Sequence, residues 1–164
     1  MNPLLRSLLL VLPCVVVGAE AGAAVTLPRE GSFDFNFCFV SDATHVTLTD
    51  KVFAGSFVNR AAMHSLRAGG AFDLQGARCF GYYGNLEGDY SDQGYCEVLD
   101  ADGDKWVMKF VSGPDGGGTW TVPFGTGKYE GMTAKGNYKP LGNVTLPAPG
   151  NARCNRNTGT YRLR

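Results

Sequence analysis

Three aspartates at alternate positions, Asp100, Asp102 and Asp104, are the residues best suited to metal binding. Alternating carboxylates supply the hard oxygen ligands that Ca²⁺ prefers. In a helix–loop–helix calcium site, however, a glycine follows the third acidic ligand and a glutamate stands at the twelfth position. Here Gly103 precedes Asp104, and the twelfth residue counted from Asp100 is Val111. We therefore predict a hairpin turn without metal, and a weak calcium site on the three aspartates is the alternative.

The two histidines, His45 and His64, are the other candidates for metal or acid–base chemistry. His45 lies among β-branched residues and His64 among small ones, and neither has an identifiable partner in the sequence. Both are predicted to be surface or half-buried residues. The sequence also lacks the GxSxG and HExxH motifs of hydrolases and metalloproteases. It leaves open whether the protein is an enzyme, and it predicts no cofactor.

Three charged residues, Arg78, Glu97 and Lys109, lie beside aromatic residues in segments with strand patterns. A charge that points into a protein interior needs a partner and is a candidate site residue. Alternation places Glu97 and Lys109 opposite their apolar neighbours, whereas Arg78 shares a face with Phe80 and Tyr82. Together with nearby aromatic residues, two of these charges give the predicted ligand-binding set: Arg78, Phe80, Tyr82, Glu97, Trp106, Phe110 and Tyr129.

Strand signals dominate the chain, and helix signals are nearly absent. Phe33, Phe35, Phe37 and Phe39 alternate with other residues, which is typical of a strand with one packed face. About eight such segments are separated by turn signals, so we predict an all-β fold with one antiparallel, eight-stranded, closed or nearly closed barrel. Residues 141–157, which contain two prolines, are predicted to be a long surface loop.

The first residues indicate export. Arg6 precedes an apolar run, and the small residues Ala21-Gly22-Ala23 fit a signal peptidase site. The run is shorter than the roughly 20 apolar residues of a membrane helix. We therefore predict a signal peptide over residues 1–23, a β-barrel domain over 24–164, no membrane span, and a periplasmic or secreted location.

The formal net charge is zero, with 15 basic and 15 acidic residues, which argues against a nucleic-acid partner. The charges are uneven along the chain: residues 87–104 are acidic, and residues 128–164 are mainly basic. We interpret these as two solvated surface regions. A basic patch for an anionic ligand, or a face for self-association, is the alternative, and the oligomeric state stays open.

Four cysteines remain once the signal peptide is removed: Cys38, Cys79, Cys96 and Cys154. An even number in an exported chain indicates two disulfides, with three possible pairings. Free buried thiols are the alternative.

The segment GTGKYEGMTAKGNY, residues 125–138, resembles a glycine-rich signature of the allene oxide cyclase-like β-barrel family. That family is related in shape to dirigent proteins and other calycin-like barrels. The hairpin DADGDKWVMKF resembles bacterial, exported members, and the resemblance covers roughly residues 75–138. It implies that Gly125 and Gly127 form a turn, while Gly136 relieves crowding in a curved strand. A phosphate-binding loop is the alternative, although no helix follows to present its N-terminus.

A closed barrel also bears on the disulfides. We favour Cys79–Cys96, because these residues lie on strands predicted to be neighbours. The remaining pair, Cys38–Cys154, would then join the first strand to the end of the chain, which meet in a closed barrel.

Three function classes follow. The leading prediction is an exported barrel that binds a small apolar or amphipathic ligand in its mouth, because an eight-stranded barrel can hold one small ligand. The first alternative is a filled barrel that acts through its surface on other molecules. The second is a cofactor-free isomerase or cyclase, which is the activity that the resemblance implies.

Overall fold

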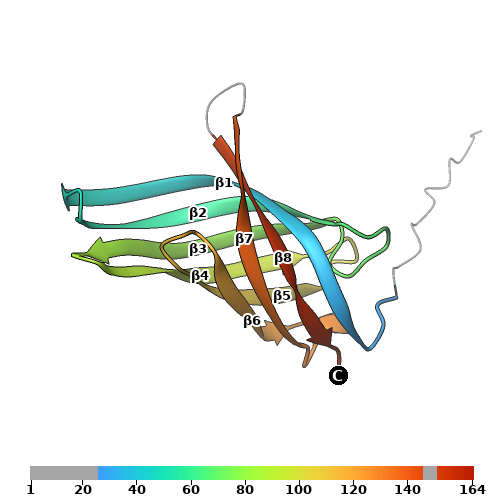
Figure 1. The fold of residues 1–164 in the computed structure, drawn as a ribbon. Coiled ribbons are helices and arrows are strands. Elements are labelled where there is room, and N and C mark those ends of the chain that lie inside the picture. The colour runs from blue at the N-terminus through green and yellow to red at the C-terminus, as the bar shows by residue number, and fades with distance from the viewer. Residues whose placement is uncertain (1–25, 146–150) are drawn as a thin grey trace, which may run out of the picture.

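A computed structural model describes residues 26–145 and 151–164 of the chain. Consecutive antiparallel strands pair in sequence order, and the last pairs with the first, which closes an eight-stranded barrel (Figure 1). The strands are β1 (Glu30–Thr49), β2 (Val52–Ser65), β3 (Gln75–Leu86), β4 (Asp89–Leu99), β5 (Lys105–Ser112), β6 (Gly118–Gly125), β7 (Thr133–Thr145) and β8 (Asn151–Arg162). The predicted fold class is thus confirmed. The predicted signal peptide, residues 1–23, lies outside the described residues.

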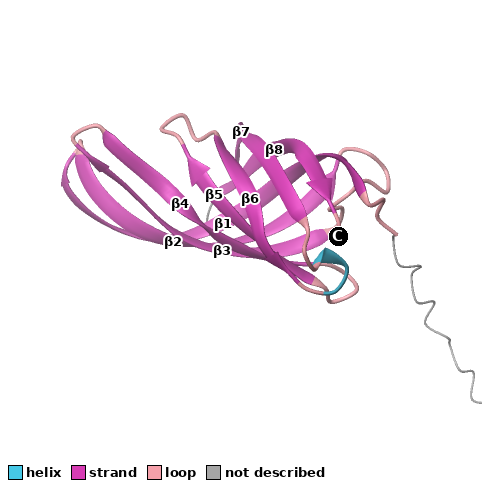
Figure 2. Cartoon of the chain, turned by 90° about the horizontal axis from the view of Figure 1, so that it is seen from below, coloured by secondary structure: helices cyan, strands magenta, loops and turns pink. Residues whose placement is uncertain are grey.

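A single 3₁₀ turn, η1 (Gly127–Tyr129), is the only helical element in the described ranges (Figure 2). Among the described residues, no helix is long and apolar enough to cross a membrane.

The strands direct alternate side chains into the barrel, as the sequence pattern predicts. On β1, Phe33, Phe35 and Phe37 are buried, and on β5 Trp106 and Met108 are buried. The charged Glu97 and Lys109 lie on the exposed outer side of their strands, as predicted.

Large aromatic side chains fill one end of the barrel. The loop between β2 and β3 places Phe72 inside the barrel, where its ring centroid lies 5.0 Å from that of Trp106 and 5.4 Å from that of Phe33. The Phe33 ring stacks on Trp120 at 5.0 Å. We call this cluster the aromatic plug: Phe33, Phe35, Phe72, Trp106 and Trp120. Burying these rings removes much apolar surface from water and closes this end of the barrel.

Buried polar side chains satisfy the indole groups of the plug. Trp106 Nε1 donates to Gln75 Oε1 at 2.9 Å, and Gln75 Nε2 donates to the Tyr129 hydroxyl at 2.7 Å. Trp120 Nε1 donates to Asn157 Oδ1 at 3.0 Å. Each of these groups would lose free energy if it were buried without a partner. The network therefore fixes the orientation of both indole rings.

The glycine-rich segment has the architectural role that the resemblance implies. Gly127 and Gly131 have positive φ angles of 53° and 69° in the turn between β6 and β7. Gly136 lies within β7 against Trp120, where an added Cβ would stand 2.5 Å from ring atom Cε2. Only a residue without a side chain leaves room for that indole ring.

Both disulfides pair as predicted, Cys38 with Cys154 and Cys79 with Cys96. In each case the two cysteines lie directly opposite each other on neighbouring strands. The first bond joins the two strands that complete the barrel, and the second lies inside it. Cys79 and Cys96 are both buried.

The predicted surface loop over residues 141–157 is wrong. β7 continues to Thr145 and β8 begins at Asn151, so the two strands stay paired almost to their connection. The register shifts between Pro140 and Gly142, which accommodates a proline inside the strand. Pro147 and Pro149 lie outside the described residues.

We predict that Gly136→Ala lowers the free energy of unfolding by about 1–3 kcal/mol, because the new methyl group would overlap the Trp120 ring. Thermal melting followed by circular dichroism measures this loss. Gly76→Ala on β3 is the matched control, since an added Cβ there has nothing within 4 Å. The control is expected to change stability by less than about 0.5 kcal/mol. Equal melting temperatures for the two variants would contradict the role given to Gly136.

Candidate functional site

The other end of the barrel is hollow. It contains a cavity of about 770 Å³, lined by inward residues of β1 to β5, β7 and β8 and by the β5–β6 hairpin. Small-molecule sites commonly have volumes of about 300–1,000 Å³. Its inner end reaches Phe37, Cys79, Cys96 and Met108, so the Cys79–Cys96 disulfide lies between the cavity and the aromatic plug.

Three aromatic rings form one wall of the cavity. The Phe57 ring centroid lies 6.3 Å from that of Tyr83 and 6.2 Å from that of Phe110. Phe57 and Phe110 lie over two glycines of neighbouring strands, because a Cβ on Gly81 or Gly94 would stand 2.6 or 2.9 Å from their respective Cζ atoms. These glycines let the rings lie close to the barrel wall, which keeps the lumen open.

A polar cluster lies next to this wall. Asp92 stands directly opposite Tyr83, one strand away. One oxygen of its carboxylate, Oδ1, is buried and accepts no hydrogen bond, while Oδ2 is 3.5 Å from the Tyr90 hydroxyl. The Ser112 and Tyr138 hydroxyls share a hydrogen bond of 2.6 Å. This cluster thus adds one under-solvated carboxylate and the hydroxyl groups of Tyr90, Ser112 and Tyr138 to the aromatic surface.

Burial changes the protonation equilibria of this cluster. Desolvation raises the pKa of Asp92, and its contacts with Ser112 and Tyr90 oppose this only in part. Desolvation also raises the pKa of Tyr138 to about 12, and it raises the pKa of Tyr90 with a further contribution from the charge of Asp92. The two phenols therefore stay protonated at neutral pH, and Asp92 holds its proton more tightly than an exposed aspartate.

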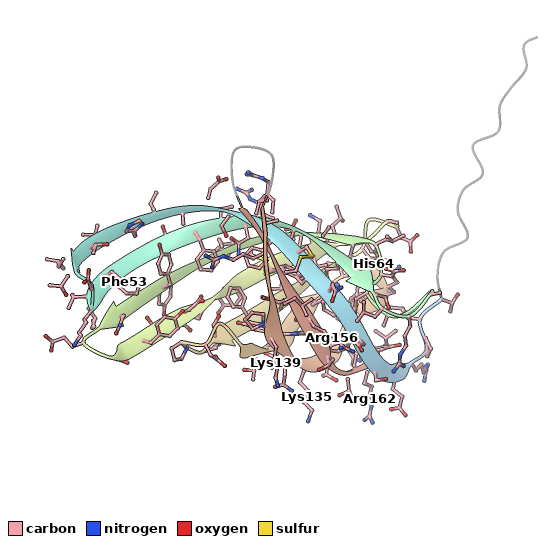
Figure 3. The ribbon with its side chains drawn as sticks, turned by 45° about the horizontal axis from the view of Figure 1, so that its top comes forward. Phe53, His64, Lys135, Lys139, Arg156 and Arg162 are labelled. Carbon is pink, nitrogen blue, oxygen red and sulfur yellow. A yellow bond between two sulfur atoms is a disulfide. The ribbon has the colours of Figure 1, made fainter. Side chains whose placement is uncertain are left out.

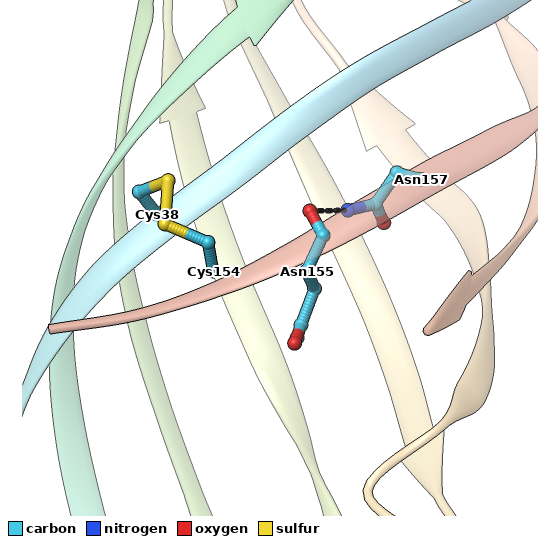
Figure 4. Close-up of a disulfide and its surroundings, with 4 residues drawn as sticks. All are labelled: Cys38, Cys154, Asn155 and Asn157. Carbon is cyan, nitrogen blue, oxygen red and sulfur yellow. Dashed lines mark hydrogen bonds between the residues drawn. A yellow bond between two sulfur atoms is a disulfide. The ribbon is translucent and has the colours of Figure 1, made fainter. Parts of the chain in front are cut away.

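Further polar groups line the β1, β2 and β8 side of the cavity. The Ser41 hydroxyl hydrogen-bonds to Asn59 Oδ1. Asn157 Nδ2 donates to the backbone carbonyl of Asn155 at 3.3 Å, near the Cys38–Cys154 disulfide (Figure 4). Arg153 is exposed, and it is the one basic residue lining the cavity within the part of the chain described.

The structure separates the predicted ligand-binding residues. Arg78, Phe80, Tyr82 and Glu97 lie on the outer wall, and 59% of Phe80 and 52% of Tyr82 is exposed. They do not line the cavity, because the next residues in alternation, Cys79 and Cys96, point inward. Trp106 and Tyr129 are buried at the plugged end, and only Phe110 of the predicted set lines the cavity.

Sequence reasoning missed Asp92, Tyr90, Tyr138 and Asn59. A signal for Asp92 was present, because alternation along β4 places it on the same face as Cys96 and Val98. That face is the buried one. An acidic residue on the buried face of a strand is a site candidate.

The acidic hairpin is held by a lysine. Lys128 Nζ lies 2.6 Å from Asp100 Oδ2 and 2.5 Å from Asp102 Oδ2, so its ammonium group offsets the charge of both carboxylates. The Asp100 carboxylate also accepts the backbone N–H groups of Asp102 and Asp104 at 2.9 and 3.1 Å. The predicted turn is confirmed, and Lys128 pairs with two of the three aspartates that the calcium alternative would use. Within the described ranges, no three metal-binding side chains cluster.

The basic residues of the C-terminal region lie mainly on the outer side of β7 and β8. Figure 3 shows Lys135, Lys139, Arg156 and Arg162 there. Two are paired with acids of β1, since Arg156 contacts Asp34 through two bonds of 2.7 and 2.9 Å, and Arg162 lies 3.1 Å from Glu30. This agrees with a solvated surface.

The two histidines are exposed, as predicted. His64 lies 3.1 Å from Asp73.

Comparison with known proteins supports the fold. No family model and no curated protein matches the sequence. Among solved structures, the chain is similar to a pterocarpan synthase dirigent protein, with a TM-score of 0.51 and 9% sequence identity over 90% of this chain and 99% of that one. At this identity the likeness concerns the fold. It agrees with the barrel class that the sequence resemblance implied.

We predict that Asp92→Asn stabilises the ligand-free protein at neutral pH by about 1 kcal/mol or less, with allowance for partial solvent screening. Because the pKa of Asp92 is raised on folding, the stability of the native protein falls as pH rises from the ordinary aspartate range through that raised pKa. The difference between the two proteins should therefore be absent in acid and grow toward neutral pH. Melting temperatures measured across this range test it.

Asp89→Asn, on the exposed start of the same strand, is the control and should show no such pH-dependent gap. If Asp92→Asn were instead less stable than the native protein at neutral pH, a partner would be stabilising the Asp92 anion.

Proposed function

We propose that this protein binds a small amphipathic molecule in the hollow end of its barrel. The apolar part of the ligand would lie against Phe57, Tyr83 and Phe110, and its polar group would reach Asp92. The observation that carries the proposal is the unpaired, half-buried carboxylate beside an aromatic wall in a cavity of about 770 Å³. Ligand sites are typically apolar and contain a few placed polar groups.

The division of the barrel favours this function over a filled barrel that acts through its surface. Within the described ranges, the largest fully buried aromatic rings lie at the plugged end, whereas the filled-barrel alternative requires such packing throughout the interior. At the hollow end, Gly81 and Gly94 stand where larger residues would displace the Phe57 and Phe110 rings into the lumen. Exposed aromatic residues on the outer wall, such as Phe80, keep surface interaction as a further role.

A cofactor-free isomerase or cyclase is the second candidate function. It is favoured by the raised pKa of Asp92, because the carboxylate is then a stronger proton acceptor than that of an exposed aspartate. The neighbouring hydroxyls of Tyr90, Ser112 and Tyr138 could orient a substrate oxygen. This second candidate includes the proposal that the chain is a member of the allene oxide cyclase-like family. The barrel fold alone does not assign that family, because dirigent proteins share it. A variant Asp92→Asn that binds substrate but no longer converts it would support catalysis.

We also propose that the protein is exported to the periplasm or secreted. Two disulfides are typical of proteins that fold in an oxidising compartment. The proposed cleavage after residue 23 is tested by the N-terminal residue of the protein isolated from its natural source.

We predict that Phe57→Ala weakens binding of the neutral fluorescent dye N-phenyl-1-naphthylamine by about ten-fold, because it removes the central ring of the aromatic wall. Phe80→Ala makes the same change on the outer wall and should leave binding unaltered. Fluorescence titration of the dye compares the two. Equal losses, or a loss only in Phe80→Ala, would move the site out of the cavity.

Native mass spectrometry of the protein purified from its natural source provides the direct test. A small molecule that co-purifies and leaves on denaturation would establish the binding function and its ligand. A bare protein that also fails to bind the dye would contradict the proposal.

A further inference from the structure

We propose that the ligand carries a positively charged amine or quaternary ammonium group, and that Asp92 is its counter-ion. This inference rests on the proposed binding function and adds the charge class of the ligand. It follows from three features of the hollow end: the isolation of Asp92, the rings around it, and the charges at the mouth.

Asp92 lacks the basic partner that comparable carboxylates have. Asp34, Asp73 and Asp100 are also largely shielded from solvent, with 20%, 22% and 6% of their side chains exposed. Each lies within 3.1 Å of an arginine, histidine or lysine nitrogen. Among the described residues Asp92 forms no ion pair, although one of its oxygens is buried without a hydrogen bond. A shielded carboxylate without a partner is unfavourable, and a cationic ligand would relieve this.

The surroundings of Asp92 suit a cation with an apolar body. Tyr83 lies directly opposite on β3, and Phe110 lies on β5 opposite Gly94, two residues from Asp92. Phe57 bridges these two rings. Aromatic faces attract ammonium groups, most strongly where water is excluded. The Tyr90 and Tyr138 hydroxyls add oxygen acceptors without adding charge.

The charges at the open end favour the approach of a cation. The β1–β2 and β3–β4 hairpins carry three acidic residues, Asp50, Glu87 and Asp89, and one basic residue, Lys51. The β5–β6 hairpin adds Asp115 at the cavity. An excess of one sign around a concave site raises the local concentration of the opposite ion and speeds its association.

Arg153 is the feature that would favour an anionic ligand instead. Its side chain is exposed. Its charge lowers the pKa of Tyr90 only slightly, because desolvation, which raises that pKa, is the dominant effect. A hydrated charge contributes less to binding than a desolvated one. The half-buried Asp92 carboxylate should therefore decide the charge preference.

Three probes with one apolar body test the inference: 4-phenylbutylamine, 4-phenylbutan-1-ol and 4-phenylbutanoate. Their affinities for the native protein are measured by isothermal titration calorimetry at neutral pH and low ionic strength. We expect the amine to bind about ten-fold more tightly than the alcohol, and the carboxylate to bind most weakly. Asp92→Asn should remove the advantage of the amine and leave the alcohol unchanged. Asp89→Asn and Arg153→Gln should preserve the order of the three probes.

Each other outcome overturns the inference in a distinct way. Equal affinities for amine and alcohol in the native protein would refute the charge preference and leave the binding function intact. Tightest binding of the carboxylate, lost in Arg153→Gln, would assign an anionic ligand. If no probe binds but the neutral dye still does, the inference fails alone, whereas loss of dye binding as well refutes both proposals. The ranking in the native protein decides the matter even if Asp92→Asn does not fold.

Discussion

The close contact between inward aromatic rings and glycines of neighbouring strands is the constraint on which the rest of this barrel depends. Trp120 lies on Gly136, and Phe57 and Phe110 lie over Gly81 and Gly94. A small closed barrel has room for only a limited volume of side chains, so several of its large rings lie where a neighbouring strand carries glycine and presents bare backbone. At the plugged end several such rings gather and fill the interior, whereas at the hollow end Phe57 and Phe110 lie against the wall and leave the cavity open.

The barrel thus has two parts. We call the end filled by the aromatic plug the base and the hollow end the cup. The base is a plug of packed rings whose polar atoms are satisfied by Gln75 and Asn157. The Cys79–Cys96 disulfide joins two adjacent strands between base and cup. The Cys38–Cys154 disulfide joins the first strand to the last, so the barrel cannot open at its seam without breaking a covalent bond. A cavity on such a base is preformed, which reduces the entropy lost when a ligand binds.

The cup contains an acidic group in an environment that disfavours its charge. Such groups reduce the stability of the protein alone, and they persist where they serve a function. For Asp92 the same physical fact supports two roles. A carboxylate that forms no ion pair is a strong counter-ion for a cationic ligand, and one with a raised pKa is a suitable proton donor or acceptor. In the first role the ligand leaves chemically unchanged, whereas in the second it is converted to a product.

The sequence by itself determined the local rules of this fold. Alternation gave the strands and their two faces, Asp and Gly residues gave the hairpin at 100–104, and the barrel topology paired the cysteines. Only the tertiary structure decided which face looks inward where both carry aromatic residues. Phe80 and Tyr82 are as apolar as Phe57 and Tyr83, but closure of the barrel puts the first pair outside and the second inside. Alternation shows that a strand has two faces but does not show which face points inward. Packing against strands distant in the sequence decides this.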